Sequence, residues 1–357
     1  MCNPNLEMRG PSDGSLACGG FSPPAPAGSA LPDTRERRRD VLQFKNYARP
    51  ETVEEAYELL RKGRMNRVLG GGVWLRLQDR RISTVIDLSA CGLDKIEETE
   101  DSFVIGSMVT LHQLECHAAF NDATCHVFEH AVRDIVGTQM RNCATVGGSV
   151  YGRFGFSDVL TALLALDCEV ELAGAGIVSL ATFVNMSYER DVLAHVIVHK
   201  HDYAASFVAV RRSATDFPVL NVCAARWDGW HVAVGARPTR ARLLEGERLA
   251  LPDDFTPEQL DAACERLSEL PMGSNMRGSE RYRRHLAREL GRRAIRRAAG
   301  LEAPAADPVA PAPRTVCAGH HGDAAPAPVS PRVAASAPAA HDPAPTQAPK
   351  GGDPACS

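Results

Sequence analysis

The sequence contains no apolar run of the roughly 18 residues that a membrane-spanning helix requires. Its N-terminus also lacks an apolar segment after its charged residues, so we expect no secretory signal. No two of its 11 cysteines form a C-x-x-C pair, and none lies near histidines at the spacing of metal ligands. Because iron–sulfur clusters and structural zinc need several closely spaced thiolates, we expect neither within this chain.

Nucleotide-binding and catalytic signatures are also missing. No G-x-G-x-x-G segment opens a long helix with an acidic residue about 20 positions later, which argues against a Rossmann nicotinamide site. The P-loop pattern is absent, so we do not expect ATP hydrolysis. Neither a G-x-S-x-G nucleophile turn nor a Cys–His nucleophile pair can be recognised, and we predict no catalytic or metal-binding side chains.

The composition is that of an ordinary globular protein. Hydrophobic residues make up 44% and charged residues 24% of the 357 residues, which is enough for a packed core and two domains. The formal net charge of -4 argues against bulk binding to nucleic acid. An odd number of cysteines in a chain of this size favours reduced thiols over a disulfide framework, so we expect a cytoplasmic protein.

Both ends of the chain differ from the middle. Residues 1–40 are rich in Gly, Pro and Ser, and residues 302–357 are dominated by Ala and Pro. Segments with so few large apolar side chains cannot bury enough surface to offset the loss of chain entropy. We therefore expect two disordered tails.

Between the tails, the residue pattern predicts helices and strands in an α+β arrangement. Thr52 and Thr110 each precede a Glu or Gln by three positions, a capping-box pattern that starts a helix. From about residue 203 the pattern becomes antiparallel β, with Asp228-Gly229 as a tight-turn pair. We expect one domain over residues 41–202 and a second over residues 203–301. Further helices are expected over residues 127–135, 260–267 and 280–298, and strands over residues 68–69, 85–88, 103–105, 192–198, 207–210, 220–225 and 230–234.

Two glycine clusters are the most distinctive local features. The first is Gly70-Gly71-Gly72, followed by Val73 and Trp74, and the second is Thr145-Val146-Gly147-Gly148-Ser149. Without Cβ atoms in the way, consecutive main-chain N–H groups can form an anion-binding nest. Two such loops that face each other could hold a pyrophosphate. A glycine triplet taken alone is equally consistent with a tight turn.

A longer pattern surrounds the second cluster. The chain has Arg141, Asn142, Ala144 and the run from Thr145 to Ser149, and then Ser157 and Asp158 before an apolar stretch. This resembles the pattern R-N-x-A/G-T-I-G-G-N/S with a later S/P-x-x-D in the FAD-binding subunits of molybdenum hydroxylases. That family includes xanthine dehydrogenase and carbon monoxide dehydrogenase. Gly70–Gly72 stand where the family has A-G-G, and Gly106, Thr110 and Leu111 match its I-G-A-x-x-T/S-L element. The resemblance covers about residues 42–298.

The resemblance implies a two-part FAD-binding domain of the vanillyl-alcohol-oxidase/PCMH type, followed by a C-terminal domain with an antiparallel sheet and helices. It implies that the two glycine loops wrap the FAD pyrophosphate and that Asp158 hydrogen-bonds the polar chain of the cofactor. Asp158 could instead, or in addition, cap a helix that begins at Val159. The cofactor-binding residues implied in this way are Gly70, Gly71, Gly72, Val73, Trp74, Thr145, Val146, Gly147, Gly148, Ser149 and Asp158.

The resemblance also implies a place in a heteromeric complex. An iron–sulfur subunit with two [2Fe-2S] clusters would pass electrons to FAD, and NAD or another soluble acceptor would take them. A separate molybdopterin-binding subunit would hydroxylate an aromatic heterocycle such as a purine. A stand-alone FAD-dependent oxidoreductase and a cofactor-free scaffold or assembly protein are the alternatives.

The chain departs from the family pattern at Val73 and Trp74, where small polar residues are common. This loss of a side-chain hydrogen bond to the cofactor keeps the scaffold alternative open. We expect Trp74 to pack in the core, with stacking on part of the FAD as the alternative. Phe154 and Phe156 are also expected to pack, and the alternative for either is a position near the isoalloxazine. Valine at Gly71 or Gly147 is expected to abolish flavin retention while folding survives.

A predicted arginine-rich helix face is expected to be solvated, with docking of an acidic partner as the alternative. Its members are Arg281, Arg284, Arg288, Arg292 and Arg296.

Overall fold

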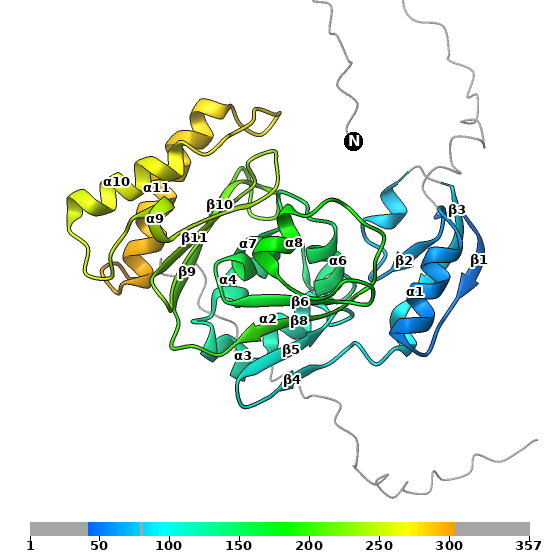
Figure 1. Ribbon diagram of the computed structural model, residues 1–357. Helices are drawn as coiled ribbons and strands as arrows, with labels where there is room; N and C mark the ends of the chain where they lie inside the picture. The colour runs from blue at the N-terminus through cyan, green and yellow to red at the C-terminus, as the bar shows by residue number, and fades with distance from the viewer. Residues whose placement is uncertain (1–41, 79–80, 304–357) are drawn as a thin grey trace, which may run out of the picture. The chain divides into compact units, whose positions relative to one another are not determined.

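The computed structural model describes residues 42–78 and 81–303 (Figure 1). The predicted tails fall outside these ranges, apart from residues 302 and 303, and remain predictions. The cysteines within the described ranges are all free. In this part of the chain, no helix has both the length and the apolar character needed to traverse a bilayer.

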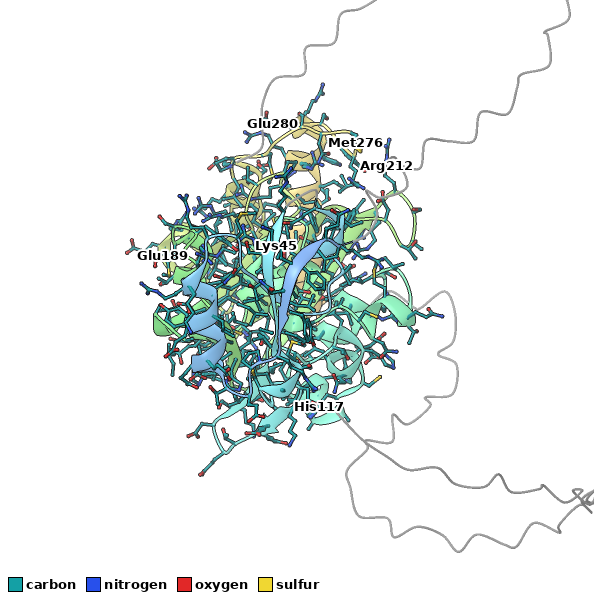
Figure 2. The ribbon with its side chains drawn as sticks, turned by 90° about the vertical axis from the view of Figure 1, so that its right-hand side faces the viewer. Lys45, His117, Glu189, Arg212, Met276 and Glu280 are labelled. Atoms are coloured by element: carbon teal, nitrogen blue, oxygen red, sulfur yellow. The ribbon has the colours of Figure 1, made fainter. Side chains whose placement is uncertain are left out.

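The described chain begins with a small parallel sheet and one helix. The sheet has the strand order β1-β3-β2, and β1 lies at its edge, toward the viewer in Figure 2. The Thr52 side chain accepts a hydrogen bond from the N–H of Glu55, which confirms the predicted start of α1. Ala56 and Leu60 of this helix pack with Ile86 in a small core. The elements are β1 (Phe44–Ala48), α1 (Val53–Lys62), β2 (Arg67–Leu69), η2 (Leu75–Leu77), β3 (Ile82–Asp87) and η3 (Leu88–Ala90).

A five-stranded antiparallel sheet of order β4-β5-β8-β6-β7 forms the middle of the described chain. Buried and partly exposed residues alternate along β6, so one face of the sheet turns to the core. Helices α6, α7 and α8 lie on that face (Figure 1). The strands are β4 (Ile96–Glu98), β5 (Ser102–Gly106), β6 (Cys168–Leu172), β7 (Gly176–Ser179) and β8 (Leu193–His199). The helices are α2 (Leu111–Cys116), α3 (Ala118–Ala123), α4 (Val127–Val132), α5 (Thr138–Arg141), α6 (Val146–Tyr151), α7 (Asp158–Leu164) and α8 (Leu180–Asn185).

The last part is a four-stranded antiparallel sheet covered by helices α10 and α11 (Figure 1). Asp228 and Gly229 lie in the turn between β10 and β11, as predicted. The strands are β9 (Ala204–Arg211), β10 (Pro218–Arg226), β11 (Trp230–Gly235) and β12 (Arg242–Glu245). The helices are α9 (Gly246–Leu249), α10 (Pro257–Ser268) and α11 (Glu280–Ala298). The predicted α+β class is therefore confirmed.

Strand β10 is buried on both faces, and this explains its almost continuous apolar sequence. Cys223 and Ala225 point into the core shared with α4 and α7, whereas Val222 and Ala224 point into the core under α10 and α11. The second sheet thus contributes one face to each of two cores.

Candidate functional site

The first glycine cluster forms an open loop at the end of β2. Pairing of β2 with β3 stops at Leu69, and Gly72 has a positive φ of 70°. Among the described residues, we find no hydrogen-bond acceptor for the main-chain N–H groups of Gly71, Gly72 and Val73. Successive free N–H groups around a left-handed residue form a nest that binds anions. This loop offers the main-chain donors that a phosphate needs.

The second glycine cluster is the first turn of a short helix rather than an open bend. Helix α6 follows Thr145, whose hydroxyl accepts a hydrogen bond from the N–H of Gly148 at 3.2 Å. The N–H of Gly147 donates to the carbonyl oxygen of Ser107 at 2.9 Å, and the neighbouring N–H groups are also bonded within the protein. The expectation that both loops offer free N–H groups therefore holds for the first loop only.

The two clusters touch through their main chains. A Cβ atom added to Gly71 would lie 1.5 Å from the carbonyl oxygen of Cys143, and one added to Gly70 would lie 2.8 Å from Thr145 Oγ1. Only glycine permits such an approach at position 71. This contact confirms the prediction that the two side-chain-poor segments lie together.

The segment from Gly106 to Leu111 forms a further wall of the same region. Thr110 makes the predicted capping box with Gln113 and also pairs with Thr145 through a main-chain bridge. The Ser107 hydroxyl is buried without a hydrogen-bond partner among the described residues, next to Gly147. A polar ligand at this wall would satisfy the hydroxyl. The residues present therefore fit a phosphorylated cofactor.

Asp158 is buried in an ion pair. Its carboxylate accepts hydrogen bonds from Arg211 at 2.8 Å and from Asn221 Nδ2 at 2.6 Å. The side chains of Asp158 and Arg211 are only 5% and 7% exposed. Burial raises the pKa of Asp158, and the Arg211 guanidinium opposes that rise. The pair joins α7 to β9, and each carboxylate oxygen already has a protein partner.

The capping alternative for Asp158 is wrong. Ser157 is the N-cap of α7, because its hydroxyl accepts a hydrogen bond from the N–H of Leu160. The helix begins at Asp158 itself, one residue before the expected start at Val159. The contact of Asp158 with the polar chain of the cofactor stays a prediction.

Trp74 belongs to an aromatic cluster beside the first loop. Its ring centroid lies 5.3 Å from that of Phe154, 5.2 Å from Phe156 and 5.7 Å from Phe217. Trp74, Phe154 and Phe156 therefore pack against one another, and whether they also contact FAD stays a prediction. Phe217 and its neighbours were not expected here, because β9 and β10 bring them to Trp74 from a distant part of the sequence and no local pattern marks that contact.

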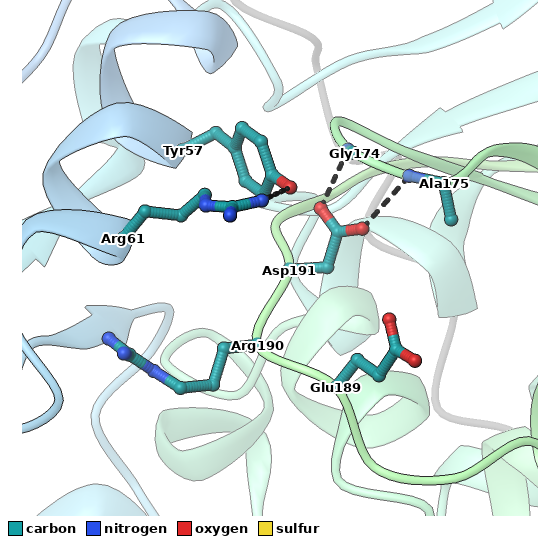
Figure 3. Close-up of a pocket in the computed structure, with 7 residues that line it drawn as sticks. All are labelled: Tyr57, Arg61, Gly174, Ala175, Glu189, Arg190 and Asp191. Carbon is teal, nitrogen blue, oxygen red and sulfur yellow. Dashed lines mark hydrogen bonds between the residues drawn. The ribbon is translucent and has the colours of Figure 1, made fainter.

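A cavity of about 520 Å³ lies between α1, the turn after β6 and the segment before β8 (Figure 3). Arg61 donates a hydrogen bond to the Tyr57 hydroxyl, and Asp191 accepts from the N–H groups of Gly174 and Ala175. Arg190 donates to carbonyl oxygens at the end of α1. None of the predicted cofactor-binding residues lines this cavity. Of the hydrogen bonds just named, only those of Arg190 join α1 to another segment.

Comparisons with known proteins agree with this arrangement. Residues 42–200 match the family model described as the FAD binding domain in molybdopterin dehydrogenase. Residues 205–298 match that of the CO dehydrogenase flavoprotein C-terminal domain.

Two curated relatives match most of their own length. The nicotine 6-hydroxylase medium subunit of Paenarthrobacter nicotinovorans is 26% identical over 70% of this chain and 95% of its own. The xanthine dehydrogenase FAD-binding subunit of Escherichia coli O157:H7 is 27% identical over 71% of this chain and 96% of its own.

Solved structures share the fold at lower identity. Carbon monoxide dehydrogenase from Hydrogenophaga pseudoflava aligns with a TM-score of 0.66 and 22% identity, covering 73% of this chain and 99% of that chain. Quinoline 2-oxidoreductase from Pseudomonas putida 86 aligns with a TM-score of 0.63 and 20% identity, covering 72% and 97%.

Proposed function

Because the chain belongs to the family of FAD-binding subunits of molybdenum hydroxylases, we propose that it transfers electrons within a xanthine dehydrogenase-like complex. FAD is its cofactor. When bound, FAD can exchange electrons singly with iron–sulfur clusters and in pairs with a nicotinamide. We assign the chain to the step between [2Fe-2S] clusters of a partner subunit and NAD or another soluble acceptor. Hydroxylation belongs to a molybdopterin-binding partner.

The main-chain contact between Gly71 and Cys143 is the observation that supports this proposal most directly. At this contact the first loop lies against Cys143 and Ala144, directly before Thr145, and the described residues supply no acceptor for the N–H groups of Gly71, Gly72 and Val73. We assign the pyrophosphate to those donors, with Gly70 at the base of the loop and the second cluster as the facing wall. Gly148 is exposed, so its main chain can be approached without a Cβ in the way.

The proposed role of Asp158 requires a local change. Both of its oxygens are bonded, to Arg211 and Asn221. A contact with the polar chain of FAD would therefore use a remaining lone pair or replace one of these bonds.

Purification of the protein from cells that express it at its natural level, followed by iron, molybdenum and flavin analysis, tests whether it belongs to such a complex. We expect the chain to co-purify with iron–sulfur and molybdenum proteins and to show flavin absorbance. Isolation with FAD but without iron or molybdenum proteins would favour the stand-alone oxidoreductase. Isolation without flavin would favour the scaffold.

A Gly71→Ala variant tests the phosphate assignment. Its Cβ cannot coexist with the Cys143 carbonyl oxygen, so the exposed loop must move away and FAD occupancy should fall by at least about tenfold, the equivalent of one lost charge-assisted hydrogen bond. Gly137→Ala is the control, because Gly137 has an extended backbone with φ of -154° and a Cβ there would meet only the Gln139 side chain at 3.4 Å. Normal FAD occupancy in Gly71→Ala would contradict the assignment.

A further inference from the structure

The cluster of Trp74, Phe154, Phe156 and Phe217 is only partly buried. Phe217 is 39% exposed, and the other three side chains have intermediate exposure. Phe154 and Phe156 are stacked with an interplanar angle of 13°. A group of rings that retains accessible surface offers a planar ligand an area on which to stack.

The cluster lies within reach of the proposed pyrophosphate site. Trp74 directly follows Val73, whose N–H group has no acceptor among the described residues. Consecutive Cα atoms are about 3.8 Å apart, so a phosphate on this loop would lie within roughly 10 Å of the indole. The polar chain that joins the pyrophosphate of FAD to its isoalloxazine ring can bridge such a distance.

The rim of the cluster carries two arginines, one of which is paired with a carboxylate, and it is partly exposed. The Arg277 guanidinium lies 5.0 Å from the ring centroid of Phe217 and pairs with Asp216 at 3.0 Å. Arg212 donates a hydrogen bond to the carbonyl oxygen of Met276, and Figure 2 places both at the same end of the described chain. Met276 is 82% exposed.

These features favour the isoalloxazine over the adenine as the occupant. An electron-transferring ring must be accessible to a partner or acceptor, and Phe217 and Met276 mark an accessible rim. A guanidinium nearby also stabilises negative charge that builds up on a reduced ring. Adenine needs neither property.

We propose that Trp74, with Phe154, Phe156 and Phe217, forms the surface on which the isoalloxazine ring of FAD stacks. Trp74 is then a positioning residue that this chain has in place of the small polar residue common in the family pattern. The inference rests on the proposed function, because it requires FAD to bind at the first loop.

Flavin fluorescence of the FAD-loaded protein, excited in the visible band where tryptophan does not absorb, tests the inference. An indole in contact with the ring quenches this emission by electron transfer. We expect Trp74→Leu to raise flavin emission several-fold and to weaken FAD binding about tenfold. Trp74→Phe retains a ring and should keep most of the affinity.

Trp227→Leu is the matched control, because Trp227 is also partly buried but packs against His201 and His231 instead. It should leave flavin emission unchanged. Unaltered emission from Trp74→Leu with FAD still bound would overturn the inference and would leave the adenine, or no ring, at this site. If Trp74→Leu does not fold, Trp74→Phe replaces it, because it removes the indole but keeps a ring. Flavin emission should again rise several-fold, and unaltered emission with FAD bound would overturn the inference. A wild-type chain that binds no FAD would instead refute the proposed function.

Discussion

At the scale of single residues, Gly71 and Gly147 are both required by close contacts, but one contact is at the surface and the other is buried. Gly71 is exposed and lies against a carbonyl oxygen of the second segment. Gly147 is buried, and a Cβ there would lie 2.6 Å from Ser107 Cβ and 2.7 Å from its carbonyl oxygen. A side chain at Gly71 can push an exposed loop aside, whereas one at Gly147 must move α6 away from the residues after β5. Valine at Gly147 should therefore impair folding as well as flavin retention, which corrects the expectation that folding survives this substitution.

We predict that Gly147→Ala lowers the free energy of unfolding by about 1–3 kcal/mol through overpacking. Gly148→Ala is the control, because its Cβ would meet only the Thr145 hydroxyl at 3.2 Å. Urea denaturation followed by circular dichroism measures both. Equal stability of the two variants would show that α6 can shift without cost.

The ion pair of Asp158 and Arg211 could not be predicted from the sequence, because its members are far apart along the chain. The motif identified Asp158 as important, but its partners Arg211 and Asn221 lie 53 and 63 positions away. Nothing in the local pattern specifies which distant strands will pack on α7. Tertiary structure alone reveals that this carboxylate joins the two sheet regions.

We predict that replacing either member of this pair alone is strongly destabilising, because it leaves the other charge buried. Asp158→Leu or Arg211→Met should each cost about 3–5 kcal/mol of unfolding free energy. The double variant should cost clearly less than the sum, since it removes both buried charges, and Asp134, which lies 3.5 Å from Arg211, is 41% exposed and stays solvated. Chemical denaturation of all four proteins measures the coupling, and strictly additive losses would contradict a direct pairing.

At the scale of elements, helix α11 could be predicted from local sequence, whereas helix α6 could not. The predicted helix over residues 280–298 has the observed bounds of α11, because its apolar residues recur every four positions over many turns. Helix α6 contains two glycines in its first turn, which intrinsically disfavour a helix. It forms because Thr145 caps it and because neighbouring segments accept its first N–H groups. Local propensity is overridden there by packing.

The arginine-rich face of α11 is largely occupied by pairing with nearby acids. Arg288 pairs with Glu265 and Arg292 with Asp261, both on α10, and Arg284 pairs with Glu280 on α11 itself. These contacts favour a solvated face that ties two helices together over a docking surface for an acidic partner.

The pair of Arg288 and Glu265 gives a prediction of pH dependence. The hydrogen bond from Arg288 lowers the pKa of Glu265 below its ordinary 4.5. A lowered folded-state pKa stabilises the protein above the unfolded pKa, and this contribution is lost as pH falls through the folded value. Glu265→Gln should therefore lower the melting temperature slightly at pH 7 but not well below pH 4. A difference that persists in acid would argue against the pair.

At the scale of the whole molecule, the α+β class and the proximity of the two glycine clusters could be predicted from the sequence. The core that connects the regions before and after residue 203 could not. A change from mixed to antiparallel pattern near residue 203 predicted a division between residues 41–202 and 203–301. The larger core nevertheless continues across that position, since it includes Phe207, Cys223 and Ala233 together with α4 and α7. Hydrophobic patterning identifies which face of a strand is buried but not which element covers it.

This shared core leads to a prediction about unfolding. Because β9, β10 and β11 supply one face to each core, residues on both sides of position 203 should unfold in a single cooperative transition. FAD binds the folded state, so at about a hundred times its Kd it should add about 2.7 kcal/mol to the stability of that whole unit. Calorimetry of the protein before and after FAD removal measures this. Two separate transitions, of which FAD shifts the temperature of only one, would contradict this prediction. The two regions would then fold independently despite their common core.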